Sequence, residues 1–345
     1  MSERFDESLL DDDVALSRSD GMLRPLAEAG ARVRREHVES AEALAAAVEE
    51  VKDDQPRAVV AAGPDSRLLR AVLEPTCPVP FVAWPGPGLP GWAGPLDLVV
   101  MLAPDGSDLG SAGAVAEAVR RGAQVVVACP PDSLVAQHAA GRHSSVLPAR
   151  SHDQLAIAVV MLELLSKVGL GPETDAEEVA AALDDVAVSC SPHREQSVNP
   201  AKALAIGLAD TTPVVWGGSV LAARAARRLA EALRRSSGTS ALAGDAEHLL
   251  PVIAAAPGRD LFDDPFADDS VGETRPALLV LDDGSEEPSI HEQRQRLISE
   301  AESHDVRVEL ISHTTGNDVA RYAELLAEGR FAAAYLGIGL SRGYY

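Results

Sequence analysis

The chain has 345 residues, a formal net charge of −23 and only 3 % aromatic side chains. This length suits two domains of ordinary size, whose cores must be filled by Ala, Val, Leu and Ile. Its negative charge repels the phosphates of nucleic acids and anionic membrane surfaces, so we predict neither as a partner. The three cysteines are widely spaced without a CxxC pair, which favours a reducing cytoplasm over disulfides or structural zinc.

Residues 1–51 are predicted to form an N-terminal arm and helices that pack on the core. The first twenty residues are polar. Ser40–Val51 (SAEALAAAVEEV) has helical apolar spacing, with Ser40 as its predicted N-cap.

An α/β segment is predicted over residues 52–168. Its first strand, Ala58–Ala62, leads into a turn with Gly63 and Ser66 and then a helix. The expected elements that follow are a short strand at Phe81–Ala83, a strand LVVML, the tripeptide Asp105-Gly106-Ser107, a helix through Arg121, strands QVVVAC and Ser145–Leu147, and a helix at Asp153–Lys167. The apolar stretch in this last helix carries Glu163 and is too short to span a bilayer.

A helical connector is predicted over residues 169–199 and a second α/β segment over residues 200–345. The second segment has an apolar strand at Val214–Trp216, a turn at Gly217–Ser219 and an alanine-rich helix. It continues with a strand ALLVL, the tripeptide Asp283-Gly284-Ser285, a helix over about Ser289–His304 and a strand VRVELI. The acidic insert at 258–276 has no ligand pattern and is expected to be a solvated loop.

The two α/β segments repeat the same two strand–turn–helix units in the same order. Such repetition predicts two similar halves of the α/β class. A strand followed by a glycine turn and a helix N-terminus presents free backbone N–H groups to an anion.

Three stretches carry a resemblance to a known family. They are Asn199–Ala205 (NPAKALA), the strand–turn–helix PVVWGGSVLAARAARR, and Phe331–Leu336 (FAAAYL), which lies where the family has a strand-like segment. The chain resembles the SIS (sugar isomerase) domain family over about residues 56–336, and looks like the bifunctional phosphoglucose/phosphomannose isomerases. The resemblance implies two pseudo-duplicated three-layer αβα sandwiches with mainly parallel sheets.

The resemblance also implies a homodimer that acts on a small phosphorylated sugar without a metal or any other cofactor. In this family a serine- and threonine-rich loop holds the phosphate, and a glutamate moves the proton. The residues predicted to bind the ligand are Gly63, Ser66, Gly106, Ser107, Ser111, Gly217, Gly218, Ser219 and Arg224. Asp105 and Asp108 place carboxylates in the phosphate loop, where they repel a phosphate dianion, and Pro64 offers no N–H group in the first turn.

The family's catalytic residues are mostly replaced. The position of the proton-moving glutamate falls near Arg235, which cannot act as a base. His248 falls at the position of the ring-opening histidine, and Asp245 and Glu247 beside it are the substitute carboxylates. The predicted catalytic residues are therefore His248, Glu247 and Asp245, with an ordinary surface histidine as the alternative interpretation of His248. The family's terminal helix with its lysine has no counterpart in the sequence.

Three functions remain open from the sequence. The first is a regulatory or weakly active protein that binds sugar phosphates. The second is an active isomerase of glucose 6-phosphate or mannose 6-phosphate to fructose 6-phosphate. The third is a structural subunit without a small ligand. A basic cluster is also present, and it either receives an anion or balances the acidic surface through salt bridges; it consists of Arg224, Arg227, Arg228, Arg234 and Arg235.

Overall fold

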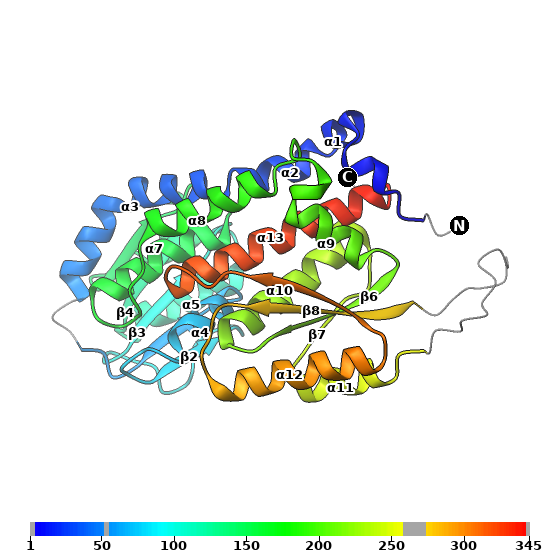
Figure 1. Ribbon diagram of the computed structural model, residues 1–345. Helices are drawn as coiled ribbons and strands as arrows, with labels where there is room; N and C mark the ends of the chain where they lie inside the picture. The colour runs from blue at the N-terminus through cyan, green and yellow to red at the C-terminus, as the bar shows by residue number, and fades with distance from the viewer. Residues whose placement is uncertain (1–3, 52–54, 258–273, 343–345) are drawn as a thin grey trace, which may run out of the picture. The chain divides into compact units, whose positions relative to one another are not determined.

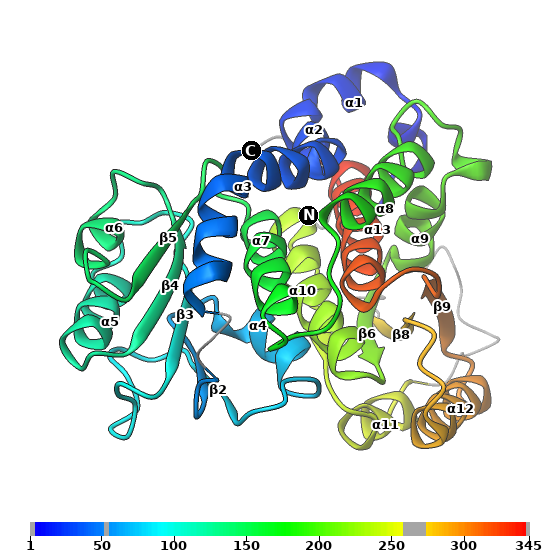
Figure 2. The same cartoon turned by 90° about the vertical axis from the view of Figure 1, so that its left-hand side faces the viewer.

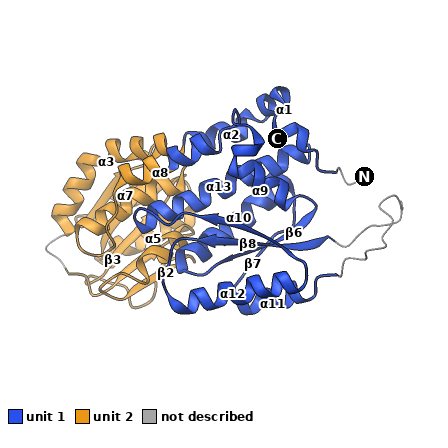
Figure 3. Ribbon diagram, in the orientation of Figure 1, with its two compact units in different colours: residues 1–28, 183–345 blue, residues 29–182 orange. Residues whose placement is uncertain are grey.

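The computed structural model describes residues 4–51, 55–257 and 274–342. The chain divides into two compact units, with residues 1–28 and 183–345 in unit 1 and residues 29–182 in unit 2 (Figure 3). Most of the acidic segment predicted to be a solvated loop, residues 258–273, lies outside the described residues. The predicted segment boundaries at 51, 168 and 199 stay predictions about domain organisation.

Unit 2 contains a five-stranded parallel sheet in the order β2-β1-β3-β4-β5. Its strands are β1 (Val59–Ala62), β2 (Phe81–Trp84), β3 (Leu98–Leu102), β4 (Gln124–Cys129) and β5 (Ser144–Pro148). Its helices are α3 (Ala29–Val51), α4 (Ser66–Leu73), α5 (Leu109–Arg120), α6 (Leu134–His138) and α7 (Gln154–Lys167), and α8 (Ala176–Ser189) leads into unit 1.

Helices cover both faces of this sheet. Figure 2 shows α5 and α6 on one face, with α3 and α7 on the other. β1 and β3 are buried along their whole length, and their near-continuous apolar sequences are those of central parallel strands. Residues from β3, β4 and α5 form one core cluster on the α5 face. The carboxyl ends of β1 and β3 consequently lie side by side at one edge of the sheet.

Unit 1 contains a four-stranded parallel sheet in the order β7-β6-β8-β9. Its strands are β6 (Thr211–Gly217), β7 (Leu242–Ala243), β8 (Arg275–Asp282) and β9 (Arg307–Ser312). Its helical elements are η1 (Glu7–Leu10), α1 (Asp13–Arg18), α2 (Asp20–Ala27), η2 (Gln196–Val198), α9 (Pro200–Leu208), α10 (Val220–Ser237), α11 (Ala246–Ala254), α12 (Pro288–Ser303) and α13 (Asp318–Gly339). α11 and α12 cover one face, whereas α9, α10 and α13 lie on the other (Figure 1).

The two sheets share one topology. When β1 to β4 are matched with β6 to β9 in chain order, the spatial order of the first sheet, 2-1-3-4, becomes the order of the second. β5 extends only the first sheet. The predicted fold, two three-layer α/β sandwiches with parallel sheets, is confirmed, and the common strand order agrees with a duplicated unit. Among the described residues, no helix is both long and apolar enough to cross a membrane.

Two local predictions are wrong. Ser40 does not cap a helix: α3 begins at residue 29 and Ser40 lies buried inside it, where its hydroxyl donates to the carbonyl of Pro148 over 2.9 Å. Phe331–Leu336 is not strand-like: it lies in the buried part of the α13 helix. Ser40 is tolerated inside α3 because its hydroxyl reaches a carbonyl acceptor, and the three consecutive alanines of FAAAYL are strong helix formers.

Candidate functional site

The first predicted turn joins β1 to α4 in unit 2. Gly63 has φ +87°, which strongly favours glycine, and a Cβ at this position would lie 3.5 Å from the hydroxyl oxygen of Ser111. The Ser66 N–H donates to the Gly63 carbonyl over 3.1 Å, which closes the turn. The structure therefore brings Gly63, Ser66 and Ser111 together at the carboxyl ends of β1 and β3.

Neither of the two polar side chains at the N-terminus of α4 caps the helix. Ser66 is 1 % exposed, and its hydroxyl oxygen has no hydrogen-bond partner among the described residues. Asp65 occupies the N-cap position, but its side chain makes no capping bond. It instead accepts a hydrogen bond of 2.7 Å from the side-chain amide of Gln154. Because no side chain caps it, the N-terminal end of α4 keeps the partial positive charge of its first N–H groups.

The second predicted turn, between β3 and α5, carries its own anion. The Asp108 carboxylate accepts a hydrogen bond of 2.6 Å from the Ser111 N–H and caps α5. Hydrogen bonds from the hydroxyl and the N–H of Ser111 lower the pKa of Asp108. Gly106 is needed for packing, since a Cβ there would lie 2.3 Å from Cβ of Ser133, and Ser107 is exposed. The predicted phosphate loop thus places a carboxylate at its helix N-terminus.

The turn between β6 and α10 in unit 1 is closed by packing. A Cβ on Gly217 would lie 2.3 Å from the backbone of Ala222, and one on Gly218 would lie 2.3 Å from Cγ2 of Ile290. The Ser219 hydroxyl accepts from the Ala222 N–H over 3.0 Å and donates to the Asp283 carboxylate at the end of β8. Close packing therefore explains why positions 217 and 218 are glycines, and no ligand is needed to account for them.

Arg224, the other predicted ligand residue of this half, is half-buried in the second turn of α10. It is one of three arginines whose positive charge acts on Tyr322 of α13. Burial raises the pKa of Tyr322, and the charges of Arg224, Arg330 and Arg228 oppose that rise. Arg224 thus belongs to a basic region shared by α10 and α13.

The three predicted catalytic residues lie at the exposed start of α11. Asp245 is the N-cap residue, with 70 % of its side chain exposed, and it is 3.9 Å from a guanidinium nitrogen of Arg227. Glu247 is 72 % exposed and forms a 2.9 Å salt bridge with Arg296 of α12. His248 is also exposed. A general base works best at a desolvated, positioned site, and these three groups are solvated instead.

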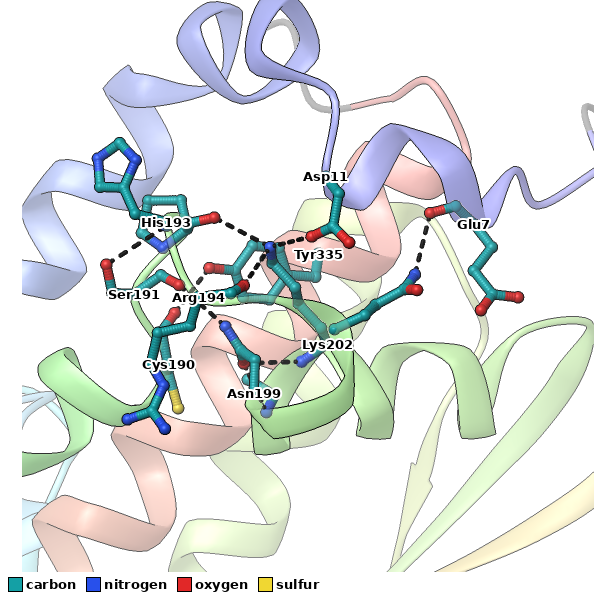
Figure 4. Close-up of polar contacts among 12 residues, drawn as sticks. Glu7, Asp11, Cys190, Ser191, His193, Arg194, Asn199, Lys202 and Tyr335 are labelled. Carbon is teal, nitrogen blue, oxygen red and sulfur yellow. Dashed lines mark hydrogen bonds and ion pairs between the residues drawn. The ribbon is translucent and has the colours of Figure 1, made fainter.

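Lys202 has a structural role that the motif match did not reveal. Its side chain is fully buried, and Nζ donates to the Asp11 carboxylate over 2.7 Å and to the carbonyls of Pro192 and Arg194 over 2.9 and 2.8 Å (Figure 4). Nζ also lies 5.6 Å from the centre of the Tyr335 ring. Lys202 therefore fastens the N-terminal segment and the loop before α9 to the core of unit 1.

The structure also forms a half-buried cluster of one histidine and two glutamates that the sequence patterns did not predict. His313, just after β9, lies 2.8 Å from Glu328 and 3.5 Å from Glu324 of α13. Burial opposes protonation, but the hydrogen bonds and charges of the two glutamates outweigh it and raise the pKa of His313 to about 9. Glu324 and Glu328 are four residues apart, so their common helix face was readable, but the approach of His313 required the fold. Among the described residues, no group of three or more His, Cys, Asp or Glu could hold a metal ion.

Comparisons with known proteins agree with this architecture. Residues 197–341 match the family model of the bacterial phospho-glucose isomerase C-terminal SIS domain. No curated protein matches the chain in sequence. The tagatose-6-phosphate ketose/aldose isomerase from Escherichia coli is 13 % identical with a TM-score of 0.66, and the alignment covers 94 % of each chain.

A second solved structure has the same relationship to the chain. It is the C-terminal domain of glucosamine-fructose-6-phosphate aminotransferase from Francisella tularensis, with 11 % identity and a TM-score of 0.64 over 93 % of this chain and 96 % of that one. At such identities the structural likeness establishes the fold alone. The expected resemblance is confirmed: the chain has a two-sheet phosphosugar-isomerase-like fold, and residues 197–341 match an SIS domain of the bacterial phosphoglucose isomerase type.

Proposed function

We propose that this chain is a sugar-phosphate-binding protein that does not isomerise its ligand at a useful rate. Its ligand's phosphate would bind at the turn formed by Gly63 and Ser66 in unit 2. The observation that carries this proposal is the Ser66 hydroxyl, which is buried at the start of α4 without a hydrogen-bond partner among the described residues.

The hydrogen-bond energetics of this turn favour an incoming anion. A buried polar group left unpaired costs about 1–3 kcal/mol. A phosphate oxygen that accepts from the Ser66 hydroxyl recovers this cost, and the N–H groups of the first turn of α4 add further donors. The other two predicted turns are less suited, because the Ser111 N–H and the Ser219 hydroxyl already donate to the carboxylates of Asp108 and Asp283.

The proposed lack of isomerase activity rests on the surroundings of the predicted bases. Aldose–ketose isomerisation moves a proton between neighbouring carbons, so it needs a carboxylate held against the sugar. Glu247 is solvated and paired with Arg296, and Asp245 is solvated at the start of α11. Neither carboxylate is held in a buried environment that would tune it as a base.

Calorimetric titration with glucose 6-phosphate, mannose 6-phosphate and fructose 6-phosphate tests the binding part. At a ligand concentration of about 100 times Kd, binding should stabilise the folded chain by about 2.7 kcal/mol. Ser66→Ala should weaken binding about tenfold or more, while the ligand-free variant is as stable as the wild type or more stable, because an unpaired hydroxyl is removed. Equal affinity in Ser66→Ala and wild type would refute this site.

A coupled isomerase assay tests the catalytic part, and no turnover is expected. Turnover that disappears in Glu247→Gln or His248→Ala would instead establish the active isomerase. The absence of binding with all three sugar phosphates would favour the structural subunit.

The assembly and location of the chain are also proposals. We infer a cytoplasmic homodimer from the family resemblance and the cysteine pattern. Light scattering coupled to size-exclusion chromatography should give about twice the mass of one chain, and a monomer mass at micromolar concentration would contradict the dimer.

A further inference from the structure

A cavity of about 240 Å³ in unit 1 concentrates positive charge in a strongly acidic chain. It is bounded by α2, α10 and α13, and its lining includes Arg228, Arg235, Arg330 and Glu231. Three positive and one negative side chain give the cavity a formal charge of +2, whereas the whole chain carries −23. Such a local reversal of sign raises the concentration of small anions at this position.

The sequence places these groups on one face of α10. Arg228, Glu231 and Arg235 are spaced by three and four residues, which aligns them along the helix. Arg228 is held by a 2.7 Å hydrogen bond to the Glu231 carboxylate. Arg235 is exposed and makes no ion pair with a described residue.

The two helices that carry the arginines are packed at glycines, which fixes their spacing. A Cβ on Gly329 of α13 would lie 2.8 Å from the side chain of Leu229, and one on Gly337 would lie 2.3 Å from the Ser236 carbonyl oxygen. Arg330 follows Gly329 directly. The arginines of α10 and α13 therefore extend from two closely packed helices.

The opposite wall of the cavity is apolar. Met22 and Leu26 lie one turn apart on α2 and both line the cavity. A volume of about 240 Å³ is just below the roughly 300 Å³ at which pockets for small molecules begin. The cavity therefore suits a compact ligand with an anionic end and a small body.

We propose that this cavity is a second ligand site, which binds a small molecule carrying a phosphate monoester. The phosphate lies against Arg228, Arg235 and Arg330, whose guanidinium groups match phosphate oxygens in pairs. The body of the molecule lies against Met22 and Leu26. This site is independent of the turn at Ser66, because it uses different residues in the other unit.

Calorimetric titration of the full chain with inorganic phosphate, glucose 6-phosphate and glucose tests the proposal in a Ser66→Ala background. Glucose 6-phosphate and inorganic phosphate should still bind, and glucose should not. Arg235→Ala should weaken phosphate binding about tenfold or more. Arg234→Ala is the matched control, since it removes the same charge one position away on the same helix and Arg234 does not line the cavity.

Removal of the Glu231 charge should change the phosphate affinity in the opposite direction. Glu231→Gln removes the one negative charge of the lining, so it should tighten phosphate binding, which a purely structural role of the cluster would not do. Equal binding in the Arg234→Ala and Arg235→Ala variants overturns the proposal. If Arg235→Ala lowers thermal stability, Arg235→Gln, which keeps most of the side chain, replaces it in the comparison.

The binding measurements distinguish a failure of the cavity site from a failure of the proposed site at Ser66. Loss of all phosphate binding in Ser66→Ala overturns the cavity site and leaves the proposed function standing. If phosphate binding is lost in the single Arg235→Ala variant but unchanged in the single Ser66→Ala variant, the cavity is supported and the turn at Ser66 is ruled out as a site.

Discussion

The hydroxyl of Ser219 at the start of α10 donates to the carboxylate of Asp283 at the end of β8. In the other unit, Asp108 caps the helix that follows β3, where its carboxylate accepts from the N–H of Ser111 in α5. Each half of the chain therefore supplies a carboxylate to a helix N-terminus at the carboxyl edge of its sheet, where such folds bind anions.

Asp283→Asn should give the α10 turn a new affinity for phosphate. The variant keeps the shape of the side chain but removes a negative charge from the helix N-terminus, so an external anion is no longer repelled. Thermal unfolding with and without inorganic phosphate checks this, because a ligand that binds only the folded state raises Tm. The same Tm increase in the variant and the wild type would contradict the prediction.

Gly217→Ala should destabilise the chain by about 3 kcal/mol or more, because its Cβ meets the backbone of Ala222 and the helix must move. Gly113→Ala is the matched control. Gly113 is exposed in α5 with no atom within 4 Å of an added Cβ, so this change should stabilise the chain by about 0.5–1 kcal/mol. Urea denaturation measures both. A neutral Gly217→Ala variant would show that the glycine is not required by packing.

His313 should make stability depend on pH in the alkaline range. Its folded pKa of about 9 lies above the ordinary value of 6.5, so its ion pairs with Glu324 and Glu328 contribute fully below about pH 6.5. This contribution decreases as the pH rises through 9. His313→Gln should cost about 1.5–3 kcal/mol near pH 6 and much less near pH 10.

The measurement for His313 is the free energy of unfolding at both pH values. Glu328→Gln serves as the partner variant, since it removes the closer carboxylate and should flatten the same pH dependence. An equal loss of stability at both pH values would mean that the charge on His313 does not matter.

Lys202→Met should destabilise unit 1 by about 3–5 kcal/mol, since it leaves the carbonyls of Pro192 and Arg194 without their buried donor. Asp11→Asn is the comparison. It removes the charge of a half-exposed partner but keeps an oxygen acceptor, so it should cost only about 1 kcal/mol. Urea unfolding ranks the two, and a larger effect for Asp11→Asn would contradict the proposed anchoring by Lys202.

The sequence alone determined the strands and helices whose signals are local. β3 is a fully apolar run, and the Asn-Pro pair at 199 and 200 marks the start of α9, where the Asn199 side chain accepts from the N–H groups of Ala201 and Lys202. The repeated order of strand, turn and helix also predicted two similar halves, because parallel strands joined by helices permit few arrangements.

Only the tertiary structure decided what the candidate site residues do. The glycine turn at 217 and 218 has the sequence of an anion site, yet Ala222 and Ile290 pack against it. The neighbouring Ser219 hydroxyl already donates to the Asp283 carboxylate. Ser66 looked like one serine among several, and its unpaired hydroxyl appears only when its burial is known. Hydrogen-bond satisfaction and close packing depend on residues distant in the chain, so a local pattern cannot distinguish a turn that binds a ligand from one closed by its own side chains.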